Sequence, residues 1–239
     1  MSPRLSPLPD RFAGTVASLH RVAEELVASS RKPDNEIALE ATPGGFGTPP
    51  FEFEGAVHRV RVEGTELVHA EDGRERRAPL TSLASAASVV AELLPAGSSP
   101  DETPLVISPA ASRALAEWYA FGAEVLGRLG ATVAPEDEAG PAILWPEHFD
   151  IAIELGPEAA GARGTYGFSP GDEEHPQPYA YVGPWTTQPR GEVWNARGFD
   201  GAELGYAELL AADDQVAAAM DFLSGRRDSL AKANPEHRA

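Results

Sequence analysis

A run of alternating apolar and polar residues, interrupted by two glycine-containing turns, most constrains the fold of this chain. The run extends from Phe51 to Leu80. Gly64-Thr65 has glycine first, which suits a two-residue hairpin turn, and Asp72-Gly73 suits a second turn. The first turn sets the register of the hairpin, so that Val62 is expected opposite Leu67. The sequence therefore predicts an antiparallel meander with one face toward the core.

Several other segments have the apolar spacing of helices. A helix is expected after Asp10 and should end near Ser30, and another should run from about Leu83 to Leu94. Ser108 is a favourable N-cap followed by proline, and it predicts a long helix that ends at Gly130. The chain closes with helices expected near 207–212 and 214–227.

The order of the predicted elements indicates the fold class. Residues Pro95–Thr103 contain proline, glycine and serine and predict a linker. On each side of it the order is helix, sheet, helix. We therefore predict one compact α+β domain over residues 1–239, with antiparallel sheets covered by helices. An ancient duplication would make 11–96 and 104–228 similar halves, and chance similarity of short strands is the alternative.

The charge of the chain excludes some classes of partner. There are 37 acidic and 19 basic residues, and the formal net charge is -18. Phosphate backbones and anionic membrane surfaces repel such a polyanion, so neither nucleic acid nor a membrane is an expected partner. The acidic excess between Ala131 and Gln215 would attract cations or a basic protein, and self-association is also open. Solubility alone is the alternative explanation.

The absence of cysteine rules out several kinds of chemistry. With no cysteine, the chain has no disulfide, thiolate nucleophile or Cys-zinc site. No apolar stretch approaches the roughly 18 residues of a membrane span, and the N-terminal residues have no apolar leader segment. We expect a cytoplasmic protein.

Carboxylates and imidazoles gather in and after a strand predicted from residue 143 to 155. Residues two apart on a strand project from the same face, so His148 and Asp150 are expected side by side. Such a pair fits an acid and base in catalysis, or ligands of a divalent metal such as zinc, manganese or iron. Glu174 and His175 in the following loop, and Tyr179 on the next strand, are the expected ligand-binding residues.

The alternative for this region is a solvated sheet face beside an acidic loop. No complete metal motif such as H-E-x-x-H is present, and the loop lacks the residue order of a calcium-binding EF-hand. The motifs of serine hydrolases, P-loop proteins and dinucleotide-binding proteins are also absent.

A second cluster lies on the predicted meander. The register places His58 opposite Glu71 and His69 opposite Val60, all on the core-facing side. Two imidazoles and a carboxylate can bind a metal ion or respond to pH. Ordinary hydrogen bonds at a sheet edge are the alternative.

Short segments spread in order over most of the chain carry a family resemblance. They are Leu19-His20 with Ile37 to Pro50, Phe51 to Leu80, Trp145 with Phe149-Asp150-Ile151-Ala152, Gly167 to Gly171 with Pro178 to Pro184, and Ala202 to Leu223. These segments resemble a bacterial family classed as domain of unknown function 5996. The resemblance implies a shared α+β fold and no particular activity. Asp150 falls where the family has an aspartate, whereas His148 replaces a small polar residue.

Two classes of function are compatible with these features. The first is a small-molecule or metal-binding protein, with enzyme activity left open, in which Asp150 is a ligand or base and His148 a ligand or acid. The second is a non-catalytic acidic module that binds a basic protein or another copy of itself.

Overall fold

The computed structural model describes residues 4–34, 36–173 and 175–233. The chain forms two compact units. The N-terminal unit comprises Ser6–Ala120 and Ile143–Phe149. The C-terminal unit comprises Phe121–Ala142 and the described residues from Asp150 onward, with Arg4 and Leu5.

The boundary between the units falls inside helix α3 (Pro109–Ala131). This division differs from the predicted halves 11–96 and 104–228, because one unbroken helix contributes to both units. The predicted linker Pro95–Thr103 lies within the N-terminal unit. An internal duplication stays a prediction.

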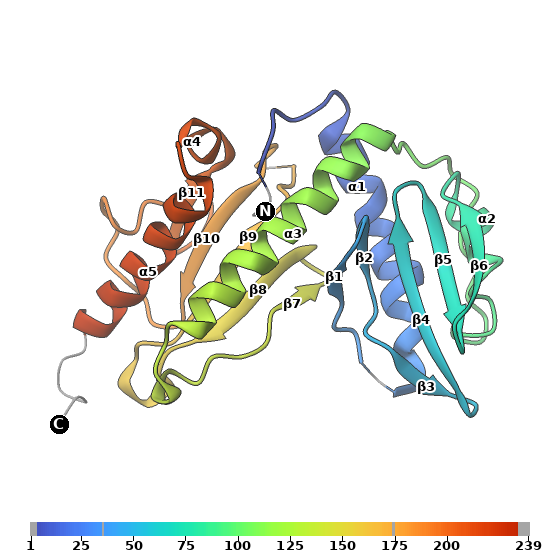
Figure 1. Ribbon diagram of the computed structural model, residues 1–239, viewed down its shortest axis with the longest axis horizontal. Coiled ribbons are helices and arrows are strands. Elements are labelled where there is room, and N and C mark those ends of the chain that lie inside the picture. The colour runs from blue at the N-terminus through green and yellow to red at the C-terminus, as the bar shows by residue number, and fades with distance from the viewer. Residues whose placement is uncertain (1–3, 35, 174, 234–239) are drawn as a thin grey trace. The chain divides into compact units, whose positions relative to one another are not determined.

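The N-terminal unit contains a six-stranded antiparallel sheet with the order β1-β2-β4-β5-β6, in which β3 pairs with β4 (Figure 1). Its strands are β1 (Glu40–Thr42), β2 (Gly45–Gly47), β3 (Phe51–Phe53), β4 (Ala56–Glu63), β5 (Glu66–Glu71) and β6 (Arg74–Pro79). In the β4–β5 hairpin, Val62 is opposite Leu67 and His58 is opposite Glu71. The predicted register is confirmed.

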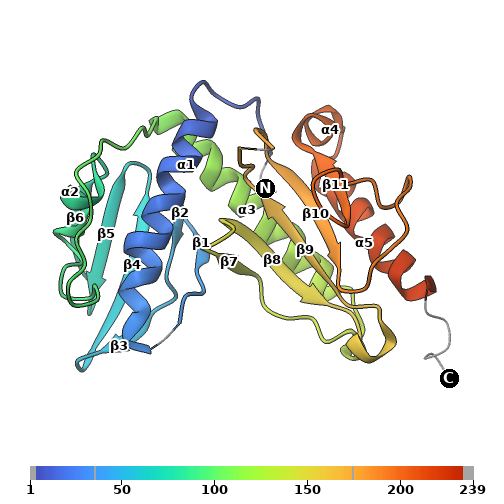
Figure 2. The ribbon, with the colours of Figure 1, turned by 180° about the vertical axis from the view of Figure 1, so that it is seen from behind.

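Helix α1 (Phe12–Val22) covers one face of this sheet (Figure 2). It continues into the helical turns η1 (Ala23–Val27) and η2 (Ala28–Asp34). Its apolar positions recur every three or four residues and are buried, which explains how it packs.

Helix α2 (Leu83–Ala87) is shorter than the predicted helix, which was expected to reach Leu94. The Ser82 side chain accepts a hydrogen bond from the backbone N–H of Ser85 and caps its first turn. After Ala87 the chain continues in turns that bury Val89, Val90 and Leu93. Branched valines are poor helix formers, and their burial favours the turns.

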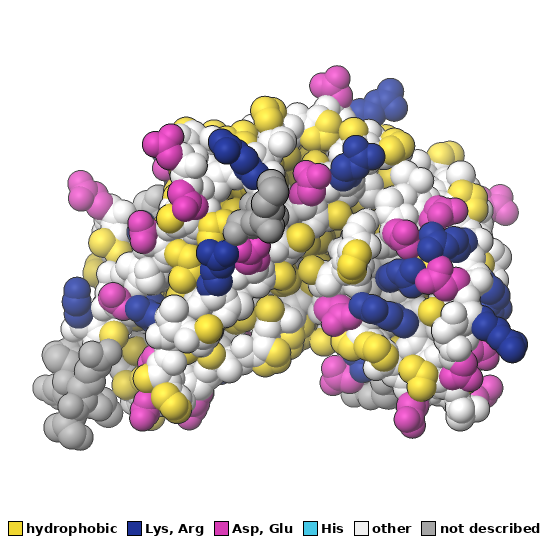
Figure 3. All heavy atoms as spheres, viewed as in Figure 1, with side chains coloured by type: hydrophobic (Ala, Val, Ile, Leu, Met, Phe, Trp, Pro, Cys, Tyr) yellow, Lys and Arg dark blue, Asp and Glu magenta, His cyan; other side chains and the backbone are white. Residues whose placement is uncertain are grey.

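The opposite face of the N-terminal sheet carries an ion-pair network, seen in Figure 3 as interleaved basic and acidic side chains over β4–β6. Arg77 lies 2.8 Å from Glu75 and 3.0 Å from Glu63, and Arg61 lies 2.6 Å from Glu75. These pairs are exposed to solvent, so each of them contributes little to the stability of the fold. Arg77 also lies 3.2 Å from Glu66, and this mixture of exposed basic and acidic side chains is typical of a solvated sheet face.

The C-terminal unit contains antiparallel strands in the order β11-β10-β9-β8. They are β8 (Asp150–Leu155), β9 (Gly164–Ser169), β10 (Tyr179–Pro184) and β11 (Ala202–Gly205). The short strand β7 (Ile143–Trp145) belongs to the N-terminal unit, where Leu144 pairs with Leu39. The short helical turns η3 (Pro135–Asp137) and η4 (Glu158–Ala160) lie in the C-terminal unit.

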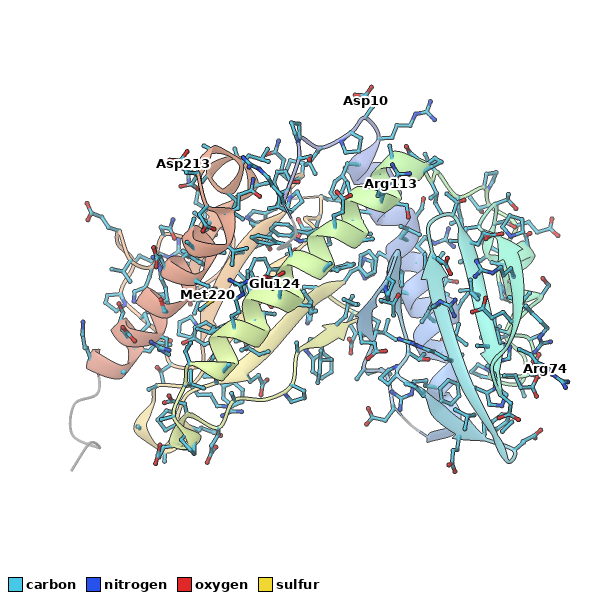
Figure 4. The ribbon with its side chains drawn as sticks, viewed as in Figure 1. Asp10, Arg74, Arg113, Glu124, Asp213 and Met220 are labelled. Atoms are coloured by element: carbon cyan, nitrogen blue, oxygen red, sulfur yellow. The ribbon has the colours of Figure 1, made fainter. Side chains whose placement is uncertain are left out.

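Helices α3 and α5 (Gln215–Ala233) cover one face of the C-terminal sheet, and α4 (Tyr206–Ala211) precedes α5 (Figure 1). Glu124 of α3 and Met220 of α5 mark the two covering helices in Figure 4. Gly122 lets α3 approach closely, since a Cβ there would lie 2.9 Å from Ile151. The predicted α+β class, with antiparallel sheets and helices, is confirmed.

Tyr166 on β9 gives the first testable prediction. Its side chain is fully buried, and its hydroxyl has no hydrogen-bond partner among the described residues. Burial raises the pKa of Tyr166 well above the ordinary value. An unsatisfied buried hydroxyl costs stability, so Tyr166→Phe should raise the free energy of unfolding by about 1 kcal/mol in urea denaturation.

The matched control is Tyr119→Phe. The Tyr119 hydroxyl is buried and donates to the backbone carbonyl of Phe149 at 2.6 Å. Its removal should lower the free energy of unfolding by about 1 kcal/mol. Equal effects of the two substitutions would contradict the prediction.

Candidate functional site

The turn Pro146–Phe149 separates β7 from β8 and decides where the predicted site residues lie. Phe149 has a φ of 52°, in the left-handed region, so the backbone does not alternate through this residue. His148 is exposed in the turn, whereas Asp150 begins β8 and is only 5% exposed. The prediction that His148 and Asp150 project from one strand face is wrong.

Asp150 lies on the face of the C-terminal sheet opposite to α3 and α5. We call this surface the tyrosine face, defined by Asp150, Gly167, Tyr179, Tyr181 and Glu203. The strand register explains its composition, because Tyr181 is opposite Gly167 on one side and Glu203 on the other. Residues two apart on β10 place Tyr179 on the same face.

The absence of a side chain at Gly167 positions Tyr181. A Cβ at residue 167 would lie 2.5 Å from Cε1 of the Tyr181 ring. The ring therefore lies over β9, and its hydroxyl donates a hydrogen bond to Oδ2 of Asp150 on β8. A phenol and a carboxylate from strands that are not neighbours are joined in this way.

The environment of Tyr181 favours its protonated form. Burial raises the pKa of Tyr181 well above the ordinary value, and the negative charge of Asp150 and their hydrogen bond raise it further. Tyr181 therefore acts as a hydrogen-bond donor at neutral pH. A buried carboxylate is costly unless hydrogen bonds compensate its desolvation, and the Tyr181 hydroxyl supplies one.

Tyr179 and His175 extend the site along β10. Ser169 is opposite Tyr179, and the two side chains are hydrogen-bonded. Burial raises the pKa of Tyr179, and the Ser169 hydrogen bond partly opposes this shift. The His175 ring packs on the Tyr179 ring with centroids 4.9 Å apart.

His175 also lies between two carboxylates. Its Nε2 is 3.5 Å from Oε2 of Glu203, and its Nδ1 is 3.7 Å from Oδ1 of Asp172. Two further hydrogen bonds join these residues: His175 N–H donates to Asp172 Oδ1 at 2.7 Å, and Asp172 N–H donates to the His175 carbonyl at 2.8 Å. These contacts hold His175 with its imidazole toward Glu203.

Residues of the loop after β10 complete the site. The Phe199 ring centroid is 6.0 Å from that of Tyr181 and 6.4 Å from that of Tyr179. A Cβ at Gly198 would lie 2.8 Å from the His175 ring, so this backbone packs directly against the imidazole. Three aromatic rings thus lie among the carboxylates of the tyrosine face.

The structure brings together part of the predicted set. Asp150, Tyr179 and His175 belong to one contiguous group, and Glu174 lies outside the described residues. Tyr181, Glu203 and Phe199 were not among the predicted site residues. The two-residue spacing from Tyr179 places Tyr181 on the same face, but no local signal indicates the other two.

The second predicted cluster is partly assembled. Nδ1 of His58 lies 2.9 Å from Nε2 of His69, and both side chains are buried. Glu71 is exposed and its carboxylate lies 4.0 Å from Arg76. Among the described residues, no group of three or more His, Cys, Asp or Glu side chains is placed to hold a metal ion.

Comparisons with known proteins do not identify a relative: no family model, curated protein or solved structure matches this chain. The resemblance to domain of unknown function 5996 therefore stays a prediction. No helix among the described residues is both long enough and apolar enough to cross a membrane. The predicted cytoplasmic location and the predicted partners stay predictions.

Proposed function

We propose that this protein binds a small organic molecule with a positively charged ammonium group on the tyrosine face. The observation that carries the proposal is the Asp150–Tyr181 pair. Asp150 is 5% exposed and is hydrogen-bonded by a phenol from a strand two positions away. A buried carboxylate beside groups with raised pKa values is typical of a functional site.

The chemistry of the surrounding side chains supports a cationic ligand. Aromatic faces attract ammonium groups, and the rings of Tyr179, Tyr181 and Phe199 lie within 6.4 Å of one another. Asp150 and Glu203 supply negative charge beside these rings. Tyr179 and Tyr181 each keep part of their surface exposed.

The alternative of a purely non-catalytic interaction module has less support. A solvated acidic surface suits that function, whereas Asp150 is buried and Tyr181 and Tyr179 are desolvated enough to raise their pKa values. Asp150 is also the residue for which the resemblance to domain of unknown function 5996 implies an aspartate.

The direct test is titration with tetramethylammonium and with tert-butanol as a neutral compound of similar shape. Changes in the tyrosine NMR signals would report binding. We expect saturable binding of the cation alone. Asp150→Asn keeps the shape of the side chain but removes its charge, so it should weaken binding at least about tenfold, equivalent to about 1.4 kcal/mol.

Glu154→Gln is the matched control. Glu154 lies on the same strand and the same face as Asp150, but it is 3.4 Å from Arg163 and is more exposed. Its substitution removes the same charge and should leave the affinity within about twofold. Equal binding of the two probes, or equal weakening by the two substitutions, would contradict the proposed function.

A further inference from the structure

Two buried histidines of the N-terminal unit are joined to each other and to two backbone carbonyls by a continuous row of hydrogen bonds. His58 is 4% exposed and His69 is fully buried. Nδ1 of His58 lies 2.9 Å from Nε2 of His69. At the two ends of this row, Nε2 of His58 lies 3.2 Å from the Phe53 carbonyl and Nδ1 of His69 lies 2.8 Å from the Val89 carbonyl.

The number of protons on the two imidazoles decides which of these hydrogen bonds can form. Both terminal partners are carbonyl oxygens, which only accept, so each terminal nitrogen must carry a proton to bond them. The contact between the two rings requires one more proton. All three hydrogen bonds together need three protons, whereas two neutral imidazoles carry two. When all three hydrogen bonds are formed, the His58–His69 pair therefore carries one positive charge.

Arg76 offers the neutral pair a different arrangement. Its Nη2 lies 2.9 Å from Nδ1 of His69, the nitrogen that also faces the Val89 carbonyl. A guanidinium only donates, so it can bond Nδ1 only when that nitrogen has lost its proton. One nitrogen thus has two partners that require opposite protonation states.

We propose that His58 and His69 take up one shared proton, and that this proton exchanges the Arg76 hydrogen bond at His69 for a bond to the Val89 carbonyl. In the neutral state, Arg76 donates to His69. In the protonated state, His69 donates to Val89 and repels Arg76. Val89 lies in the segment after α2, His69 lies on β5 and Arg76 lies on β6. Proton uptake therefore changes how this segment is hydrogen-bonded to the sheet.

Other charged groups surround the pair and set its response. Oε1 of Glu92 lies 3.6 Å from Nδ1 of His69 and also pairs with Arg76. Glu71 is opposite His58 on β5 and lies 4.0 Å from Arg76. On the other side, Arg31 lies over the Phe51 ring, which stacks on His58.

The expected pH range lies below neutrality. Burial lowers the pKa of His69 from 6.5, the Arg76 charge lowers it further, and the Val89 hydrogen bond opposes these effects. The unfolded chain therefore binds this proton more readily than the folded chain. The unprotonated His69 therefore contributes to the free energy of unfolding. This contribution is complete above about pH 6.5 and is lost as the pH falls toward the lower pKa of the folded state.

The test is an NMR titration of the intact protein with ¹⁵N-labelled histidine and ¹³C-labelled carbonyls. His58 and His69 should titrate together, and the Val89 carbonyl signal should move with them as its hydrogen bond strengthens. Arg76→Gln should raise the midpoint of this shared titration by about one pH unit, because it removes a neighbouring positive charge and a donor to the neutral ring.

Arg74→Gln is the control, since Arg74 is on the same strand but extends into solvent at its end (Figure 4). It changes the net charge equally and should move the midpoint little. Three results would overturn the proposal: two independent titrations near the ordinary pKa, a Val89 carbonyl signal that does not follow the imidazoles, or unfolding before the pair gains a proton. Equal shifts in the two arginine variants would also overturn it.

Discussion

Replacement of Phe149 by alanine is expected to lower the free energy of unfolding by about 4 kcal/mol, the usual cost of removing a fully buried aromatic ring. Phe149 is 1% exposed. Its ring stacks on His20 with centroids 5.0 Å apart, and it meets Phe46 and Tyr119 edge-on at 5.1 and 5.6 Å. Alanine would leave these three rings around a cavity.

The backbone of Phe149 makes the prediction more specific. Its φ of 52° is unfavourable for any residue with a side chain. The ring contacts hold this conformation, and they are absent from both Phe149→Ala and Phe149→Gly. Glycine adopts a positive φ without strain, so Phe149→Gly should be about 1 kcal/mol more stable than Phe149→Ala.

Urea denaturation of the two variants checks this order. In a regular strand or helix the order is the opposite, because glycine loses more conformational entropy than alanine on folding. A cost below about 1 kcal/mol for Phe149→Ala would show that the aromatic cluster does not stabilise the turn. A glycine variant less stable than the alanine variant would contradict the positive φ.

Gly167→Ala is expected to destabilise the protein by about 2 to 3 kcal/mol and to disrupt the candidate site. The added methyl group would lie 2.5 Å from the Tyr181 ring, so the ring must move off β9. Movement of the ring would break the hydrogen bond from Tyr181 to Asp150. The pKa of Tyr181 should then fall toward its ordinary value, because the phenol becomes more exposed.

Two measurements follow the effects of Gly167→Ala separately. Urea denaturation reports stability, and ultraviolet absorbance during an alkaline titration reports ionisation of the tyrosines. The proposed binding of tetramethylammonium should also be lost. These readouts distinguish a displaced Tyr181 ring from a general loss of packing.

Gly183→Ala provides the matched control on strand β10. A Cβ at residue 183 would meet no atom within 4 Å. The same chemical change should therefore cost less than about 0.5 kcal/mol and leave the pKa of Tyr181 unchanged. If Gly167→Ala behaves like Gly183→Ala, the close approach of Tyr181 to β9 does not position the site.

The β4–β5 hairpin could be predicted to the residue. Glycine in the turn and the alternation along β4 act over a few residues, so they determine the register without help from the rest of the chain. The structure has His58 opposite Glu71, as predicted. The same register makes the two buried histidines diagonal neighbours on adjacent strands.

The region from residue 143 to 155 shows where local reasoning fails. Alternation alone predicts one strand, but Phe149 adopts a positive φ and the chain turns from Pro146 to Phe149. The burial of the Phe149 ring among residues distant in sequence compensates for that backbone conformation. As a result, His148 is exposed whereas Asp150 is buried.

The sequence by itself determined the α+β class, the antiparallel meander and the register of its hairpin. It also identified Asp150, His175 and Tyr179 as candidate site residues. Only the tertiary structure decided that Tyr181 reaches Asp150 across Gly167 and that Glu203 faces His175. Turn geometry and alternation act between near neighbours, whereas these site contacts depend on how separate strands and loops pack.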